Sequence, residues 1–200
     1  MNQQLIISVG REFGSGGHEI AQKLSEKYGI AFYDRNLLKE LAEKRNLNHE
    51  ELAEFDEIKK NKLMSRTVRG MSNSSAQNVA YLQFEYLKKK ADEGESFVIV
   101  GRCAETVLKD YKALISIFVL GDMDEKLERI MRIYKLSEGG AKEMLAEKDR
   151  KRKQYHNSYC KIKWGDSRNY EISINSSKLG VDESVRILSE YIDARIAQNK

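Results

Sequence analysis

The 200-residue sequence contains no proline, only two cysteines and a single tryptophan. Without proline or a glycine- or serine-rich tract, composition offers no linker at which to divide the chain, so we expect one domain over 1–200. The two cysteines, Cys103 and Cys160, are too few for a disulfide scaffold and lack metal-ligand spacing. We therefore expect reduced thiols without a function and predict no metal ligands.

Long apolar segments are also missing. No stretch approaches the roughly 20 residues that span a bilayer. The first ten residues lack the basic start and long apolar middle of a signal peptide. We expect a cytoplasmic protein with no membrane partner, and the sequence indicates no particular oligomeric state.

A large net charge is absent as well, because 35 basic and 31 acidic residues leave only +4. Charge is nevertheless concentrated between residues 142 and 163, where eight lysines and arginines accompany three acids. Such a segment suits either a polyanionic ligand or a solvated helix face. Tyr155, Tyr159 and Trp164 interleave with these bases, as in single-strand binders. The near-neutral remainder makes nucleic-acid binding the weakest interpretation, and we expect no nucleic-acid partner.

Glycine is concentrated near the N-terminus, where residues 10–18 read GREFGSGGH. An apolar run at 5–9 precedes this segment, and a helical pattern at 19–28 follows it. A strand, a glycine-rich turn and a helix in that order are typical of a phosphate cradle, because backbone N–H groups and the helix N-terminus attract anions. The lysine usual in such a loop is missing. Of the three histidines, only His18 lies in a motif, so we expect His49 and His156 on the surface.

Apolar segments alternate with helical patterns along the rest of the chain. Beyond the first strand, we expect strands at 30–33, 97–100, 113–120 and 169–175. This alternation predicts an α/β fold with a parallel sheet. Two long polar segments interrupt the pattern and are expected to form movable flaps. They lie at 36–75, read as thin polar helices, and at 129–163, with a loop from 154 to 168.

Polar residues follow the expected strands at the edge where a parallel sheet places its ligands. Asp34 either contacts a ligand there or caps the next helix, and these two roles are compatible. Arg102, after Gly101, matches a carboxylate or phosphate bidentately, although a structural ion pair remains an alternative. The turn at Asn175 and Ser176 ends the last strand, and Gln83 is placed to face the same cleft.

Asp149 and Arg152 lie three residues apart and so share a helix face, where the carboxylate can orient the guanidinium. A phosphate cradle, a separate arginine anchor and an arginine-bearing flap together suit phosphoryl transfer between two bound nucleotides. That reaction depends on positioning and charge neutralisation more than on a nucleophilic side chain.

The sequence resembles the cytidylate kinase-like family of P-loop nucleoside monophosphate kinases from about residue 4 to residue 195. Six segments carry the resemblance in the family's order: 8–17, 32–34, 98–102, 149–152, 164–166 and 174–177. The resemblance implies a three-layer P-loop fold with a helical acceptor-binding insertion at 36–75 and a helical lid at 129–163. It also implies ATP and Mg²⁺ as cofactors and small nucleotides as ligands.

The same resemblance assigns roles to individual residues. The ATP site would comprise Gly14, Ser15, Gly16, Gly17, His18, Arg129, Asn175 and Ser176. The acceptor site would comprise Asp34, Gly101, Arg102 and Gln83. Arg152, steadied by Asp149, would lie on the transferring phosphoryl group.

Three residues depart from the family's pattern. Gly17 stands in place of the lysine, His18 occupies the usual hydroxyl position, and Cys103 replaces an aspartate that often follows the Gly-Arg pair. Arg11 falls at the first-glycine position, because the spacing from Gly10 to Gly16 is one residue longer than usual.

Two functions therefore remain open. In the first, Arg11, His18, Arg150 or Arg152 replaces the lysine, and an active kinase transfers the ATP γ-phosphoryl group to a (d)CMP-like monophosphate or another small acceptor. In the second, the cradle binds a nucleotide without turnover, as a sensor or regulatory protein does. The kinase is favoured, because the acceptor arginine, the lid arginine and the flap all remain.

Overall fold

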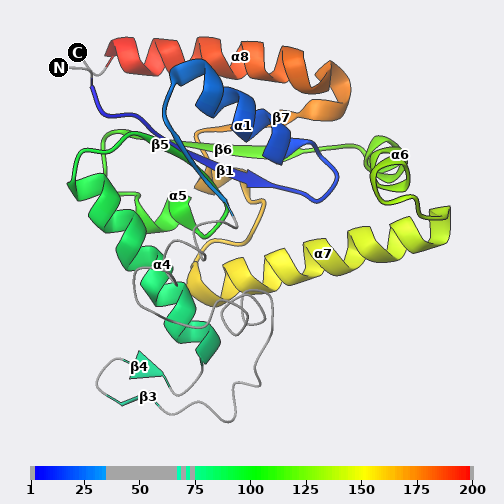
Figure 1. The fold of residues 1–200 in the computed structure, drawn as a ribbon, viewed down its shortest axis with the longest axis horizontal. Coiled ribbons are helices and arrows are strands. Elements are labelled where there is room, and N and C mark those ends of the chain that lie inside the picture. Colours follow the sequence, from blue (N-terminus) through cyan, green and yellow to red (C-terminus); the bar gives the residue numbers. More distant parts are fainter. Residues whose placement is uncertain (1–2, 35–66, 69–70, 73–74, 199–200) are drawn as a thin grey trace.

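A computed structural model describes residues 3–34, 67–68, 71–72 and 75–198. Its centre is a five-stranded sheet in the order β2-β5-β1-β6-β7, in which every pairing is parallel (Figure 1). This confirms the α/β class and the parallel sheet. The strands are β1 (Ile6–Arg11), β2 (Ala31–Tyr33), β5 (Phe97–Val100), β6 (Leu114–Leu120) and β7 (Ile172–Asn175).

Helices cover both faces of the sheet, which explains why its inner strands are almost continuously apolar. On one face, Ile7 and Val9 of β1 pack in a core with α1 (Gly17–Tyr28) and α8 (Ser176–Gln198). On the other face, Ile6 packs with α4 (Ser75–Asp92) and with Ala104 of the short α5 (Ala104–Val107). Figure 1 shows α1 and α8 above the sheet and α4 and α5 below it.

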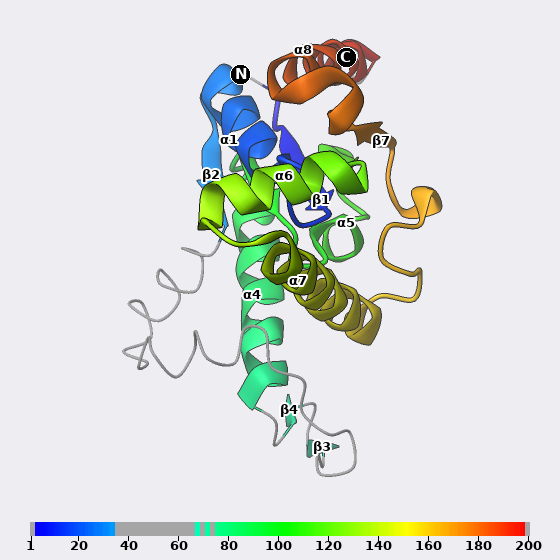
Figure 2. The same cartoon turned by 90° about the vertical axis from the view of Figure 1, so that its right-hand side faces the viewer.

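Two further helices, α6 (Met123–Tyr134) and α7 (Glu138–Tyr159), form a hairpin beside the end of β1 (Figure 2). Helix α6 ends at Tyr134, and Ser137 caps α7 by accepting a hydrogen bond from the Gly140 N–H at 3.3 Å. Ile130 and Leu145 pack together in a small core that Phe13 of the glycine-rich segment joins. The hairpin is thereby attached to that segment.

The loop expected from residue 154 is wrong for its first six residues, because α7 continues to Tyr159. Tyr155 and Tyr159 pack against each other at a tilt with ring centroids 5.0 Å apart, and Tyr159 also packs edge-on against Phe84 of α4 at 5.4 Å. These aromatic contacts give the helix a buried face that its charged sequence conceals.

Most of the insertion expected at 36–75 lies outside the described residues, including His49. Where it is described, β3 (Thr67–Val68) and β4 (Met71–Ser72) form an antiparallel hairpin, so the helix expected at Val68 is wrong. The boundaries of both flaps stay predictions. Across the described ranges, no helix combines the length and apolarity needed to cross a membrane.

Candidate functional site

The glycine-rich segment forms a tight loop between β1 and α1. Gly14 and Gly16 have φ angles of 82° and 76°, a left-handed conformation that residues with a side chain rarely adopt. Buried Ser15 donates a hydrogen bond to the Glu12 carbonyl at 2.9 Å and holds the turn closed. Gly16 stands at the N-cap of α1 and brings no capping side chain, so the loop presents the helix N-terminus as an anion cradle does.

The side chain of Arg11 explains why position 17 is a glycine. A Cβ atom added at Gly17 would lie 2.6 Å from the Arg11 Cβ and 3.1 Å from the Val119 Cβ, closer than packed carbons approach. A lysine at position 17 would collide with the stem of Arg11. The Arg11 guanidinium extends to the end of β5, where a Cβ atom on Gly101 would meet its Nη1. Arg11 thus passes over the usual lysine position and ends beside the Gly101–Arg102 turn.

Lys126 of α6 is a second cation at the loop, and no sequence motif predicts it. Its side chain is only 7% exposed, and its Nζ lies 2.8 Å from Glu12 Oε2. The same carboxylate oxygen accepts a hydrogen bond from the Gly121 N–H at 3.2 Å. A Cβ atom at Gly14 would lie 3.1 Å from the Lys126 Cβ. This buried ion pair therefore fixes the glycine loop to the start of α6. A single lysine in an amphipathic helix belongs to no motif, so the sequence alone does not predict its place at the loop.

One cavity opens on the α6 side of the loop, and we call it the donor-side cavity. It measures about 310 Å³ and is lined by Gly14, Ser15, Glu125, Glu128, Arg129, Arg132, Ser176, Ser177 and Gly180. Arg129 pairs with Glu19 at 3.0 Å, and its Nη2 would lie 3.2 Å from a Cβ on Gly16. Ser176 donates hydrogen bonds to the carbonyls of Ser15 and Leu120 at 2.5 and 3.1 Å, so the start of α8 is tied to the loop. Asn175 donates to Asp122 Oδ1 at 2.7 Å and orders the same turn.

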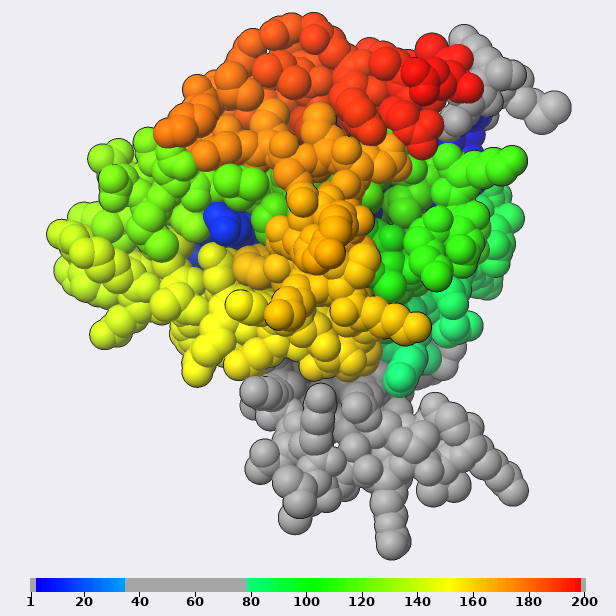
Figure 3. Space-filling model, turned by 180° about the vertical axis from the view of Figure 1, so that it is seen from behind, coloured from blue at the N-terminus to red at the C-terminus, as the bar shows by residue number. Residues whose placement is uncertain are grey.

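A second cavity, which we call the acceptor-side cavity, is lined by Gly10, Arg11 and Phe13 of the glycine-rich segment and measures about 170 Å³. Its basic lining residues are Arg11, Arg102, Lys148, Lys151 and Arg152. Its aromatic lining residues are Phe13, Tyr134, Tyr155, Trp164 and Tyr170. Figure 3 shows the blue N-terminal segment at the bottom of an opening between the α6–α7 hairpin and the orange residues that precede β7. Cationic groups between aromatic walls suit a ligand that carries both an anion and a planar ring.

Helix α7 contacts the glycine loop directly. Asp149 Oδ1 accepts a hydrogen bond from the Phe13 N–H at 2.6 Å, and burial raises the pKa of the Asp149 carboxyl above its usual value. Arg152 donates to the Arg11 carbonyl at 3.3 Å and lies over the Phe13 ring at 5.2 Å. The predicted Asp149–Arg152 pair exists, but its atoms are 3.8 Å apart. The closer partner of Asp149 is the loop backbone.

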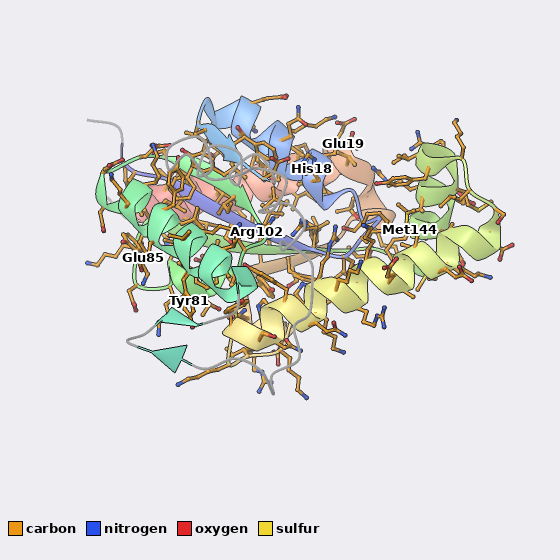
Figure 4. All side chains as sticks on the ribbon, turned by 60° about the horizontal axis from the view of Figure 1, so that its bottom comes forward. His18, Glu19, Tyr81, Glu85, Arg102 and Met144 are labelled. Atoms are coloured by element: carbon orange, nitrogen blue, oxygen red, sulfur yellow. The ribbon has the colours of Figure 1, made fainter. Side chains whose placement is uncertain are left out.

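Figure 4 shows Arg102 between α4 and α7 and His18 at the start of α1. Arg102 and Cys103 both have positive φ, 60° and 55°, an uncommon conformation for residues with a side chain. The Arg102 guanidinium lies 5.8 Å from the Tyr155 ring centroid. His18 Nε2 lies 2.9 Å from Asp34 Oδ2, so the end of β2 and the start of α1 are joined.

Eight predicted site residues line neither cavity among the described parts of the chain: Gly16, Gly17, His18, Asp34, Gln83, Asp149, Arg150 and Asn175. Arg150 is exposed on the outer face of α7. Gln83 is fully buried, and its Oε1 accepts a long hydrogen bond from the Tyr155 hydroxyl at 3.5 Å. Gln83 therefore contacts the wall of the acceptor-side cavity without lining it, because its partner Tyr155 is a lining residue.

The surface position expected for His156 is wrong. His156 is 4% exposed, and its Nε2 lies 2.8 Å from Oε1 of the equally buried Glu105. Burial alone would lower the pKa of His156, but hydrogen bonds with Cys160 and Glu105 raise it to about 10. Glu105 and His156 are 51 residues apart in the sequence, so no short sequence motif predicts that they pair.

Comparison with known proteins identifies the family and the fold. A model of the cytidylate kinase-like family matches residues 6–178. The crystal structure of an uncharacterized protein from Eubacterium ventriosum ATCC 27560 is 42% identical, with a TM-score of 0.76. The match covers 95% of this chain and 99% of that chain. No curated protein matches the chain significantly.

More distant structures share the fold. A shikimate kinase from Bacteroides thetaiotaomicron is 15% identical, with a TM-score of 0.56, over 94% of this chain and 98% of that chain. A gluconokinase from Sinorhizobium meliloti 1021 is 11% identical, with a TM-score of 0.52, over 99% of this chain and 94% of that chain. The parallel sheet in the order β2-β5-β1-β6-β7 is that of P-loop kinase structures. The chain has the P-loop kinase fold and belongs to the cytidylate kinase-like family.

Proposed function

We propose that this protein is an ATP-dependent kinase that transfers the γ-phosphoryl group to a small anionic acceptor, with CMP or dCMP as the first candidates. One observation carries the proposal. The glycine loop lies between two separate cavities, and charged side chains line both of them. A protein that only bound one nucleotide would need only one of these cavities.

On the donor side, the loop N–H groups and the N-terminus of α1 would hold the ATP phosphates. Arg129 lies next to Gly16 and adds positive charge there. The Asn175–Ser176 turn, tied to the loop through Ser15, would line the part of the site that holds the rest of ATP. Gly14 to His18, Arg129, Asn175 and Ser176 are thus proposed as the donor site.

On the acceptor side, Arg102 is the proposed anchor for the acceptor phosphate, and Gly101 leaves room for the Arg11 guanidinium beside it. Its neighbours in the cavity include Lys148 and Lys151 from α7, so an anionic group would meet several cations in a partly enclosed space. The aromatic side chains Tyr155 and Trp164 offer faces on which a pyrimidine can stack.

Arg11 is the proposed replacement for the missing lysine. Its stem crosses the position of Gly17, and its guanidinium lies beside the acceptor anchor. It therefore lies where the loop meets the acceptor-side cavity, and we propose that it neutralises the negative charge that develops during transfer. Arg152, which contacts the Arg11 backbone and Phe13, is the proposed second cation and is carried by α7.

Mg²⁺ usually binds one or two carboxylates together with the substrate phosphates. The residues present fit such an ion, because Asp34 brings a carboxylate to the first turn of α1 beside His18. When bound, Mg²⁺ would neutralise charge on the ATP phosphates. Asp34 is the residue that we propose to hold it.

The altered glycine loop favours a second candidate function, that of a nucleotide sensor. Gly17 and His18 leave the loop without its usual lysine and hydroxyl, so a sensor that binds a nucleotide without turnover remains a candidate. The acceptor-side cavity favours the kinase over this sensor.

A product-resolved phosphoryl-transfer assay separates these functions. The purified protein is incubated with ATP and Mg²⁺ and with each ribo- and deoxyribonucleoside monophosphate, and with shikimate and gluconate because kinases of these names share the fold. We expect diphosphate product from CMP or dCMP. Turnover of another acceptor would change the proposed substrate and leave the kinase proposal intact. ATP binding without any product would instead support the proposal of a nucleotide sensor.

A further inference from the structure

Three side chains with metal-binding atoms meet at the inner end of the acceptor-side cavity. Glu105 lies in α5, His156 in the last turn of α7, and Cys160 at the C-cap of α7. One ligand atom from each residue lies within 4.8 Å of the other two. Glu105 and His156 line the cavity, yet neither has a part in the proposed phosphoryl transfer.

The separations between these atoms are close to those of a coordination site. The Glu105 Oε1 atom lies 2.8 Å from His156 Nε2 and 3.9 Å from Cys160 Sγ. Tetrahedral zinc, with bonds of about 2.0 Å to N and O and 2.3 Å to S, holds its ligand atoms about 3.3–3.6 Å apart. Shifts of about half an ångström in side-chain position would bring Glu105 Oε1 to this spacing from both His156 Nε2 and Cys160 Sγ, which is within ordinary rotamer adjustment.

The backbone holds two of the ligands in place. His156 and Cys160 are four residues apart on the same helix face, and the Cys160 N–H donates to the His156 carbonyl at 2.8 Å. Both side chains are thereby presented together to Glu105. The third ligand comes from α5, which begins directly after the Arg102–Cys103 turn.

A second layer of polar groups orients the ligand atoms. His156 Nδ1 lies 3.4 Å from Asn157 Oδ1, which leaves Nε2 directed at Glu105. Asn169 Nδ2 donates to Glu105 Oε1 at 3.3 Å. Partners of this kind typically accompany histidine and carboxylate ligands and set their orientation.

We propose that Glu105, His156 and Cys160 bind Zn²⁺, with the fourth position open to water from the acceptor-side cavity. A thiolate, an imidazole and a carboxylate form a donor set that suits zinc and disfavours Mg²⁺ or Ca²⁺, which prefer oxygen ligands. Binding releases the thiol proton of Cys160 and the proton shared by His156 and Glu105. The ion joins α5 to α7 and so fixes the turn that carries Arg102.

Metal binding itself tests the proposal, without reference to kinase activity. The full chain is kept reduced with a phosphine, stripped with a chelator, and titrated with Zn²⁺ against a chromogenic competitor. We expect one Zn²⁺ per chain. Co²⁺ in place of Zn²⁺ should give a thiolate-to-metal charge-transfer band, because Cys160 supplies a sulfur ligand.

Two cysteine variants form a matched pair. Cys160→Ser should lose the cobalt band and bind Zn²⁺ at least tenfold more weakly. Cys103→Ser should keep both properties, because Cys103 packs beside Cys160 but lies outside the group of three. Asn169→Ala should weaken binding about 10- to 100-fold by releasing Glu105.

Two results overturn the proposal. One is a reduced wild-type chain that takes up no Zn²⁺ and shows no cobalt band, a measurement that requires no variant to fold. The other is equal loss of binding in Cys103→Ser and Cys160→Ser, which would assign the metal to a different ligand set. Neither result bears on whether the protein is a kinase, since the readout is metal alone.

Discussion

The two cavities beside the glycine loop differ in charge. The acceptor-side cavity is lined by five lysines and arginines and one acid, Glu105, which is already paired with His156. The donor-side cavity has two arginines and two acids, Glu125 and Glu128. Each cavity is therefore suited to a different part of the reaction.

This difference in charge follows from the groups that neutralise the ligand's phosphate charge in each cavity. On the donor side, backbone N–H groups and the dipole of α1 attract phosphates, so the surrounding side chains need little net charge. The acceptor-side cavity meets the glycine-rich segment at Gly10, Arg11 and Phe13 and not at the turn that begins α1, so an anion there depends on side-chain cations. Removing one arginine should accordingly weaken ligand binding more in the acceptor-side cavity than in the donor-side cavity.

The largest effect is expected for Arg11→Ala, since Arg11 is the proposed replacement for the lysine and lines the acceptor-side cavity next to the glycine loop. Turnover should fall about 100- to 1,000-fold, the range for loss of one group that stabilises transition-state charge. Steady-state kinetics with both substrates measures it. Arg186→Ala, which removes an exposed arginine of α8, is the control and should retain wild-type turnover. Unchanged turnover in Arg11→Ala would remove Arg11 from the site.

Arg102→Ala should weaken acceptor binding about 10- to 100-fold, because hydrogen bonds to charged groups contribute about 1.5–3 kcal/mol. ATP affinity should remain unchanged, since Arg102 lines only the acceptor-side cavity among the described residues. Calorimetry with each nucleotide separately tests both statements. Equal losses for the two nucleotides would indicate that Arg102 has a structural role.

Gly17→Ala should lower the free energy of unfolding by about 1–3 kcal/mol through overpacking against Arg11. Gly139→Ala is a matched control in the first turn of α7, where an added Cβ meets no atom within 4 Å. The control should be neutral or stabilising by up to about 1 kcal/mol. Denaturant unfolding compares the two variants, and equal stabilities would show that Arg11 does not exclude a side chain at position 17.

The smallest effect is expected for Arg129→Ala on the donor side. Arg129 is 27% exposed and paired with Glu19, so its loss should weaken ATP binding only about two- to fivefold. Acceptor binding should not change. A loss of ATP affinity as large as the acceptor loss in Arg102→Ala would contradict the division of charge between the cavities.

The sequence alone is sufficient to predict the elements that follow local patterns. Alternating apolar segments predicted the parallel sheet, and the glycine spacing placed the loop between β1 and α1. Other features depend on contacts between residues that are distant in the sequence. The contact of Arg11 with Gly17 and Gly101, the burial of Lys126 against Glu12 and the pairing of His156 with Glu105 arise only when separate elements pack.

The error at the end of α7 has a similar cause. Residues 154–159 are polar and aromatic without a clear period, so a loop was a reasonable interpretation. Their helical form depends on Tyr155 and Tyr159 packing together and on Tyr159 packing against Phe84 of α4, which is a tertiary contact.

The most direct test of two separate nucleotide sites is calorimetric titration of CMP into protein saturated with a non-hydrolysable ATP analogue and Mg²⁺. We predict that CMP binds the saturated protein at one molecule per chain and leaves the analogue bound. If CMP instead displaces the analogue, or binds only in its absence, both nucleotides share one cavity and the proposed two-substrate site is wrong.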